Sequence, residues 1–305
     1  MHKPLILSFL ACLVPWQAYA EETTRILFIG NSYTAQIRNT VKNLIKSSPE
    51  GDSTQMEFIC PGGKTLDFHQ QTKSTTEKIK KGNWDYVVLQ DQSQTPAIFP
   101  DKFERAAVNL DKMIDAAGAK TVFYQTWGRR DGDKHNRHLF PDYQKMQKVL
   151  STNYRKVAKR CDAVLVPVGD TWAKVRKANP ELGNALYKGD GSHPSSQGAY
   201  LAACVFYATL FEKSPASLPY QSGHPESETK VILEAVGSPA GKPEPRAFPT
   251  NRTLTNAEGH KIEASISGRS KTKVYFKTRS KSFVYDISQL SEASQTMIHR
   301  LPINR

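Results

Sequence analysis

Short apolar runs that alternate with helical patterns constrain the fold of this chain most. Five such runs lie at residues 25–30, 56–60, 84–89, 121–126 and 163–168. Each is apolar on both faces, which is typical of a strand buried in a parallel sheet. Helical spacing occurs between or after them, at 40–47, 103–117, 142–160, 170–178, 196–211 and 226–236. The order predicts an α/β three-layer sandwich with a central parallel sheet.

The N-terminus has the features of an export signal. A lysine near the start precedes an apolar stretch, and Ala18-Tyr19-Ala20 has the small-x-small form of a cleavage site. The stretch is too short to span a bilayer, and no later segment approaches a span. We therefore expect residues 1–20 to be a signal peptide cut after Ala20, and the mature protein to be secreted or periplasmic. A lipoprotein anchored at Cys12 is the alternative.

The C-terminal part has a different composition. Residues 237–249 carry four prolines and predict a linker between a domain at 21–236 and a small β domain at 250–305. Period-2 patterns at 261–266 and 273–277 predict strands in that second domain. The net charge of the chain is +13, and more than half of it falls after residue 241. This basic surface would suit an acidic envelope polymer, or simply be solvated. Because no basic helix or aromatic–basic repeat occurs, we expect no nucleic-acid partner.

Three cysteines follow the predicted signal peptide, at Cys60, Cys161 and Cys204. An odd number allows at most one intramolecular bridge. Whether any two are bridged stays open, and disulfides are not expected to organise the fold.

Ser32 is the first candidate for chemistry. It follows the first strand, and Gly30 permits a sharp turn before it. Functional groups gather at the carboxyl ends of parallel strands. A serine hydroxyl needs a base, an orienting acid and donors for the oxyanion. Asp190 and His193, three residues apart, can supply acid and base from one loop. The alternative is an aspartate helix cap beside an incidental histidine.

Four blocks resemble those of the SGNH (GDSL-like) hydrolases, in order and over most of residues 25–236. They are ILFIGNSYT at 26–34, PGGKTLD at 61–67, VVLQDQS at 87–93 and DGSHPSSQGAYLAA at 190–203. The resemblance implies the flavodoxin-like SGNH fold and an ester hydrolase with the triad Ser32, His193 and Asp190. With Trp127, Gly128 and the stretches at Tyr154 and 167–169, the chain looks closer to a DUF4886-like branch than to the common lipases.

The resemblance also implies an oxyanion hole formed by the amides of Ser32 and Gly63 and by a side chain of the third block. This sequence departs from the family there, because glutamine replaces the usual asparagine. Gln92 aligns with that asparagine and could donate the same bond from a side chain one methylene longer. Gln90 is the alternative. Asn31 replaces the usual aspartate before the serine.

Residues 129–138 form a highly polar segment after the fourth strand. Arg129 and His135, together with Asn31 and Trp127, are candidates for substrate binding. An ordinary solvated loop and, for Trp127, core packing are the alternatives. Nothing fixes a ligand geometry, so we expect no metal at Asp131, Asp133, His135 and His138, and no cofactor.

Together these features predict an exported serine esterase that hydrolyses O-acyl esters, O-acetyl esters foremost, with a small molecule or a glycan as substrate. A lipase or lysophospholipase is the first alternative, and a degenerate hydrolase that binds an envelope polymer is the second. RTLTNAEGHKIEA at 252–264 and the segment 274–294 resemble an SH3-like barrel of the Sla-homology type.

Overall fold

The computed structural model describes residues 23–237, 252–270, 272–277, 282–299 and 301. The predicted signal peptide at 1–20 and nearly all of the predicted linker at 237–249 lie outside these ranges. Among the described residues, no helix is both long and apolar enough to cross a membrane.

A five-stranded parallel sheet forms the centre of the larger part. Its strands are β1 (Thr24–Ile29), β2 (Thr54–Ile59), β3 (Tyr86–Leu89), β4 (Lys120–Tyr124) and β5 (Val164–Val166), in the order β2-β1-β3-β4-β5. Every neighbouring pair is parallel. The inner strands are almost wholly buried, as runs that are apolar on both faces require. All five predicted strands are confirmed.

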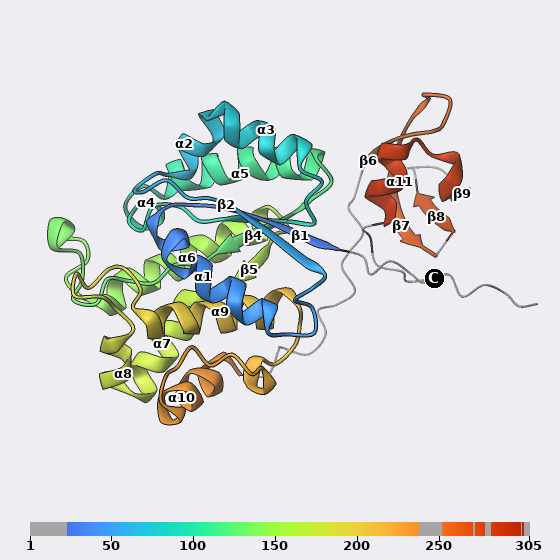
Figure 1. Cartoon of the computed structure of the whole chain (residues 1–305). Helices are drawn as coiled ribbons and strands as arrows, with labels where there is room; N and C mark the ends of the chain where they lie inside the picture. The colour runs from blue at the N-terminus through green and yellow to red at the C-terminus, as the bar shows by residue number, and fades with distance from the viewer. Residues whose placement is uncertain (1–22, 238–251, 271, 278–281, 300, 302–305) are drawn as a thin grey trace, which may run out of the picture.

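Helices cover both faces of this sheet (Figure 1). One apolar core packs α1 (Ser32–Lys46), α7 (Val168–Ala178), α9 (Ser196–Leu210) and α10 (Glu226–Val236) on one face. A second core packs α3 (Lys73–Lys81), α5 (Pro100–Ala116) and α6 (Tyr143–Arg160) on the other. α9 is buried along nearly its whole circumference. The predicted α/β three-layer sandwich is confirmed.

The first helix begins earlier than its pattern predicted. The helical spacing indicated 40–47, whereas α1 begins at Ser32. Asn31 caps it by accepting a hydrogen bond from the backbone of Tyr33, and Tyr33 and Ile37 then face the core. Short elements were also missed, because three to nine residues give too little periodicity. They are α2 (Leu66–Gln71), α3, α4 (Thr95–Ile98), α8 (Pro180–Ala185), η1 (Lys134–Asn136) and η2 (Pro215–Ser217).

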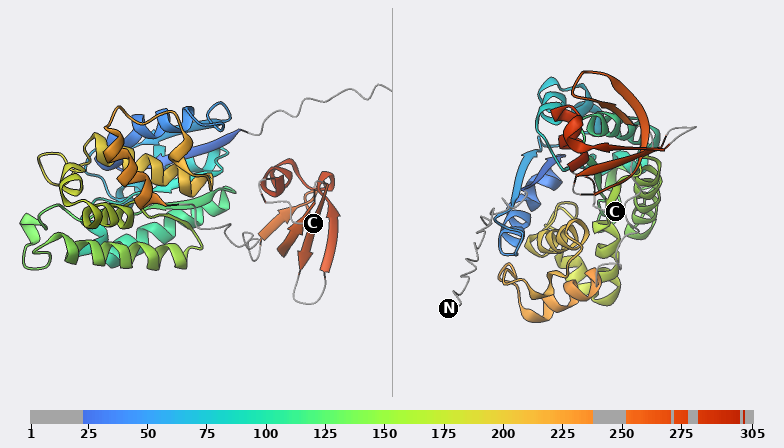
Figure 2. Two further views of the ribbon diagram at one scale, coloured as in Figure 1. Left: turned by 90° about the horizontal axis from the view of Figure 1, so that it is seen from below. Right: turned by 90° about the vertical axis from the view of Figure 1, so that its right-hand side faces the viewer.

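The C-terminal part has an antiparallel sheet of its own, shown from two further sides in Figure 2. Its order is β6-β7-β8-β9, with β6 (Arg252–Thr255), β7 (Lys261–Arg269), β8 (Lys273–Lys277) and β9 (Ser282–Asp286). η3 (Ile287–Gln289) and α11 (Glu292–His299) follow, and the sequence did not predict either. Leu254, Ile266 and Phe276 lie in a small core that shares no residue with the other two. The domain boundaries and the SH3-like topology stay predictions.

The three described cysteines, Cys60, Cys161 and Cys204, are free thiols. Cys204 is buried in α9, and the other two are half-buried.

Candidate active site

Ser32, His193 and Asp190 form one line of hydrogen bonds. The Oγ atom of Ser32 lies 2.9 Å from Nε2 of His193, and Nδ1 of His193 lies 2.5 Å from Oδ2 of Asp190. With the Nδ1 proton on the carboxylate side, Nε2 presents its lone pair to the serine hydroxyl. A serine, a base and an orienting acid thus stand in the geometry that nucleophilic catalysis requires.

The Asp190 carboxylate is held in its charged form. Its second oxygen accepts hydrogen bonds from the backbone N–H groups of Ser192 and His193, both at 2.9 Å. Partial burial raises the pKa of Asp190, but the bonds from His193 and these two amides outweigh burial and bring that pKa below its ordinary value. The aspartate is therefore both a cap for its own loop and the acceptor behind the imidazole.

Gly30 and Asn31, the two residues before Ser32, fix the turn that carries it. A Cβ on Gly30 would lie 2.3 Å from Oγ1 of Thr34, so only glycine fits there. The carbonyl of Gly30 accepts a 2.8 Å hydrogen bond from the fully buried ring of His69. The side-chain amide of Asn31 donates to the carbonyl of Lys64 at 2.9 Å, which ties the serine turn to the glycine-rich second block.

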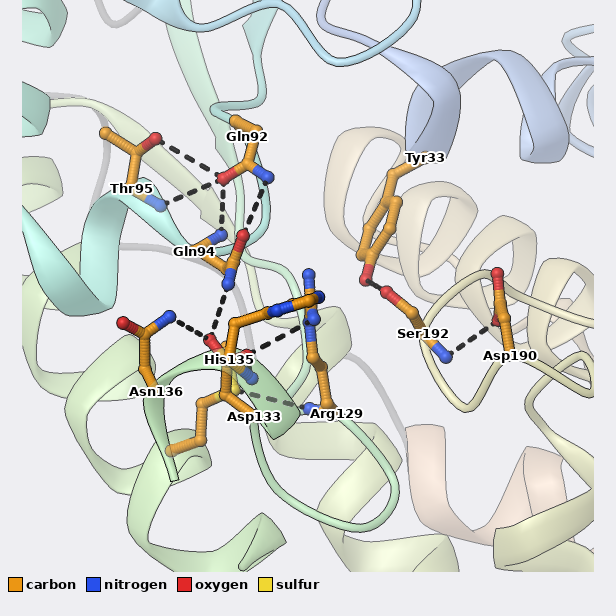
Figure 3. Close-up of polar contacts among 11 residues, drawn as sticks. Tyr33, Gln92, Gln94, Thr95, Arg129, Asp133, His135, Asn136, Asp190 and Ser192 are labelled. Carbon is orange, nitrogen blue, oxygen red and sulfur yellow. Dashed lines mark hydrogen bonds and ion pairs between the residues drawn. The ribbon is translucent and has the colours of Figure 1, made fainter. Parts of the chain in front are cut away.

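Aromatic side chains hold the loop that carries His193. The hydroxyl of Tyr33 lies 2.7 Å from Oγ of Ser192, and the indole of Trp127 donates to the Ser192 carbonyl at 3.0 Å. The edge of His193 packs on the Tyr33 ring, with centroids 5.2 Å apart. Figure 3 shows Tyr33, Ser192 and Asp190 joined in this way. Tyr33, which directly follows the serine, thus connects the first block to the last.

The two candidate glutamines have different surroundings. Gln90 is fully buried, and its carbonyl oxygen accepts from the backbone of Asn31 at 3.0 Å and from the hydroxyl of Thr34 at 2.8 Å. Gln92 is half-buried, and its oxygen accepts from the backbone N–H groups of Gln94 at 2.7 Å and Thr95 at 3.2 Å. Gln90 therefore supports the serine turn from the interior, whereas Gln92 lies nearer the surface.

Asp91, between the two glutamines, ties the second block to the third. It is 1% exposed, and its Oδ1 accepts from the backbone of Leu66 at 3.1 Å and of Gln92 at 2.7 Å. Burial raises the pKa of this carboxyl to about 7. Gly63, just before α2, has a φ of +69°, and nothing lies within 4 Å of the place where a Cβ would be. A side chain at position 63 would therefore point into open space.

The sequence proposal that Trp127 stacks on a sugar is wrong. Its ring is fully buried, with Tyr33 stacked at 4.9 Å and Trp172 stacked at 3.9 Å. Because aromatic rings occupy its surroundings, the core-packing alternative is confirmed. Asn31 is also buried, at 2% exposure, and both ends of its amide bond the protein itself. It is a structural residue of the serine turn rather than a surface for substrate.

The polar segment after β4 is organised around a buried carboxylate. Asp133 is 1% exposed and accepts from Nη1 of Arg129 at 3.3 Å and from the backbone of His135 at 3.1 Å. Arg129 is half-buried, and His135 is exposed. Among the residues that the structure describes, no three His, Cys, Asp or Glu side chains are grouped so that they could hold a metal ion.

Several residues that build the site could not be identified from the sequence. His69, Tyr33 and Gln94 lie in or beside the four blocks, yet their partners are 39 to 159 positions away in the chain. Only the fold brings such pairs together. The Gly30 carbonyl, which His69 binds, belongs to the backbone and leaves no residue-type signal at all.

Comparison with known proteins finds likeness at the level of structure. No family model and no curated protein matches the sequence. A DUF4886 family protein from Bacteroides uniformis is 20% identical with a TM-score of 0.60, over 70% of this chain and 93% of its own. A putative SGNH hydrolase from Slackia heliotrinireducens is 28% identical with a TM-score of 0.54, over 62% of this chain and all of its own. An acetyl xylan esterase is 16% identical with a TM-score of 0.50, over 61% of this chain and 99% of its own.

The matches cover 61–70% of this chain, which fits a single α/β domain with additional residues outside it. The sheet order, the four blocks and the likeness to the Slackia protein agree with one another. We therefore assign the chain to the SGNH hydrolase superfamily, with the fold that the DUF4886 family protein also has.

Proposed function

We propose that this protein hydrolyses O-acyl esters, O-acetyl esters of carbohydrates foremost, through a covalent acyl-serine. The observation that carries the proposal is the line from Ser32 through His193 to Asp190, with contacts of 2.9 and 2.5 Å. It supplies a nucleophile, a base and an orienting acid at the carboxyl edge of a parallel sheet.

The reaction proceeds in two halves. Oγ of Ser32 bonds to the ester carbonyl carbon while Nε2 of His193 takes the hydroxyl proton. The tetrahedral oxyanion accepts hydrogen bonds from the backbone amides of Ser32 and Gly63 and from the side-chain amide of Gln92. When the C–O bond to the alcohol breaks, His193 returns the proton to the leaving oxygen. Water then attacks the acyl-serine with His193 again as base, which releases the acid and restores Ser32.

An open site favours a bulky, hydroxylated alcohol. The side chains of Asp190 and His193 are 47% and 29% exposed, and Gly62 and Gly63 have nothing within 4 Å of an added Cβ. A polymer-borne ester can approach such a surface without entering a channel. A lipase or lysophospholipase is the alternative, since Phe68 and Phe99 are exposed on segments that follow β2 and β3.

Turnover of matched esters tests this proposal. We expect Ser32→Ala to abolish hydrolysis of p-nitrophenyl acetate and of an acetylated xylan, while Ser196→Ala, an exposed serine at the start of α9, keeps the wild-type rate. Rates on p-nitrophenyl acetate, butyrate and octanoate then separate the alternatives, because a lipase prefers the longer chains. Equal turnover by the wild type and Ser32→Ala would leave the degenerate, polymer-binding hydrolase as the better account.

We also propose that the protein is exported after cleavage behind Ala20, and that residues 250–305 form an SH3-like domain that binds an acidic envelope polymer. The signal-like sequence of residues 1–20 and the basic excess after residue 241 support this. The N-terminal sequence of the extracytoplasmic protein tests the first part. Salt-sensitive retention on immobilised polygalacturonate, lost when residues 250–305 are deleted, tests the second.

A further inference from the structure

The orientation of the Gln92 amide matters because only its N–H₂ end can stabilise an oxyanion. Glutamine has one more rotatable bond than the asparagine that the family places here, so a free side chain would lose donor geometry to rotamer averaging. Its oxygen is fixed by the backbone N–H groups of Gln94 and Thr95, at 2.7 and 3.2 Å. These contacts point the oxygen towards the start of α4 and leave the nitrogen on the other side (Figure 3).

The nitrogen end of Gln92 is held as well. Nε2 of Gln92 donates to Oε1 of Gln94 at 3.3 Å, and Nε2 of Gln94 donates to Oδ2 of Asp133 at 2.5 Å. Figure 3 shows the three side chains in one line. An amide nitrogen carries two N–H groups, and within residues 23–237 only Gln94 accepts from that of Gln92. The second N–H has no acceptor within those residues.

Asp133 determines the donor-to-acceptor order of the hydrogen bonds that join Gln92, Gln94 and Asp133. A carboxylate only accepts hydrogen bonds, so the N–H₂ end of Gln94 must face Asp133 and its carbonyl must face Gln92. The carbonyl of Gln94 in turn requires the N–H₂ end of Gln92. Reversing either amide would place two acceptors or two donors against each other. One buried charge thus fixes the polarity of Gln94, and the carbonyl of Gln94 reinforces the polarity that the backbone N–H groups already give to Gln92.

Asp133 itself cannot easily turn away. It is 1% exposed and accepts from Arg129 at 3.3 Å, from Nδ2 of Asn136 at 2.9 Å and from the backbone of His135 at 3.1 Å. Burial raises the pKa of Asp133, and the bonds from Gln94, Asn136 and Arg129 bring it below its ordinary value. The carboxylate therefore stays charged, and an acceptor, throughout the neutral range.

We propose that Gln94 and Asp133 are positioning residues that set the side chain of Gln92 as an oxyanion donor. The inference rests on the proposed esterase function and on the role of Gln92 within it. The proposed role of the polar segment 129–138 is neither metal binding nor direct contact with substrate. The segment holds the carboxylate of Asp133, which orients the Gln92 donor through Gln94.

A double-mutant cycle tests whether Gln94 acts through Gln92. We expect Gln94→Ala to lower kcat roughly 10- to 100-fold with little change in KM, because a displaced donor affects the transition state more than the bound ester. Added to Gln92→Ala, the same change should have no further effect. Lys134→Ala, an exposed change in the same segment, should be silent in both backgrounds. A full additional loss in the Gln92→Ala background would overturn the proposal.

Gln94→Glu adds a readout that a purely structural role would not move. The new side chain keeps an acceptor for Gln92 but presents a carboxylate to Asp133, and two adjacent carboxylates cannot both stay ionised cheaply. Protonating the pair restores a donor towards Asp133. The ratio of the kcat of Gln94→Glu to that of the wild type should therefore rise as the pH falls, with the titration of the base cancelling in the ratio. A flat ratio would count against the inference.

Different results would refute the esterase proposal and the positioning proposal. If Ser32→Ala matches the wild type, catalysis is refuted, and a crystal structure of Gln94→Ala then decides the positioning claim alone. We expect Nε2 of Gln92 to shift from its position in that structure, because its contact with Gln94 is lost while the backbone N–H groups still hold its oxygen. If it stays in place, Gln94 does not position it. If Ser32→Ala is inactive but Gln92→Ala is fully active, esterase activity stands and the oxyanion role falls, and the positioning proposal falls with it.

Discussion

Gln90→Ala should damage stability rather than catalysis. The carbonyl oxygen of Gln90 accepts from the backbone N–H of Asn31 at 3.0 Å and from the hydroxyl of Thr34 at 2.8 Å, and all of these groups are buried. Truncation leaves both donors without an acceptor. Each buried, unsatisfied donor costs about 1–3 kcal/mol, so we expect the free energy of unfolding to fall by about 2–6 kcal/mol.

That loss is large against the about 5–15 kcal/mol that stabilises an ordinary domain. At roughly 2–4 °C per kcal/mol, the melting temperature of a domain of this size should drop clearly. Urea unfolding followed by circular dichroism, with the thermal midpoint as a second probe, measures the effect. Gln92→Ala is the matched control: it removes half-buried hydrogen bonds to the backbone before and at the start of α4 and to the side chain of Gln94, a loss of about 1 kcal/mol.

For activity, we expect Gln92→Ala to be the more damaging of the two variants. Gln92→Ala should lower kcat on the order of 10²–10³-fold, as loss of one oxyanion donor does, while Gln90→Ala that remains folded should lose much less. Thr34→Val in the Gln90→Ala background removes one stranded hydroxyl, so the double variant should recover part of the lost stability. Wild-type unfolding of Gln90→Ala, or a larger loss of kcat in Gln90→Ala than in Gln92→Ala, would refute the structural role of Gln90.

Three further predictions follow from other parts of the structure. Trp127→Ala should cost about 3–5 kcal/mol of stability by emptying a buried stack, without raising KM for an acetylated glycan more than KM for p-nitrophenyl acetate; a selective rise would restore the sugar-stacking role. Burial raises the pKa of Asp91 from 3.8 to about 7, so its contribution to stability is complete below about pH 4 and is lost as the pH rises to 7. Asp91→Asn keeps the acceptor for Leu66 and Gln92. It should reduce the difference in the free energy of unfolding between pH 4 and pH 8 by on the order of 4 kcal/mol, as measured by urea unfolding. The same difference in the variant and the wild type would contradict this prediction. Deletion of residues 240–305 should leave turnover of p-nitrophenyl acetate intact, because the C-terminal core shares no residue with the other two; insoluble protein would show that the predicted boundary is wrong.

The parallel sheet could be predicted because its strands are short and apolar on both faces. In the run RILFIG, Ile26 to Ile29 are fully buried, and no helical period fits so short a run between polar segments. Asp190 and His193 could be paired from sequence for a similar reason. Their contact spans three residues, so local geometry decides it.

Contacts between distant segments could not be predicted. Trp127 was equally compatible with a sugar platform and a core residue, because its exposure depends on Tyr33 and Trp172, which are far from it in the chain. The start of α1 was missed because its first turn is polar in sequence, and its cap, Asn31, also belongs to the serine turn. Burial, which decides both cases, is a property of the assembled fold.

Three glutamines at alternate positions, Gln90, Gln92 and Gln94, show why residue type alone left the oxyanion donor open. Each has one accepting and one donating end, so composition and spacing do not separate them. Their partners do. Donors of the serine turn hold the oxygen of Gln90, whereas the carboxylate of Asp133 fixes the N–H₂ end of Gln94 and, through it, that of Gln92. In the proposed arrangement, the glutamine that replaces asparagine is held at its oxygen by two backbone N–H groups and at its nitrogen by Gln94 and Asp133, so a change at Gln94 alone should move the donor while leaving its residue type intact.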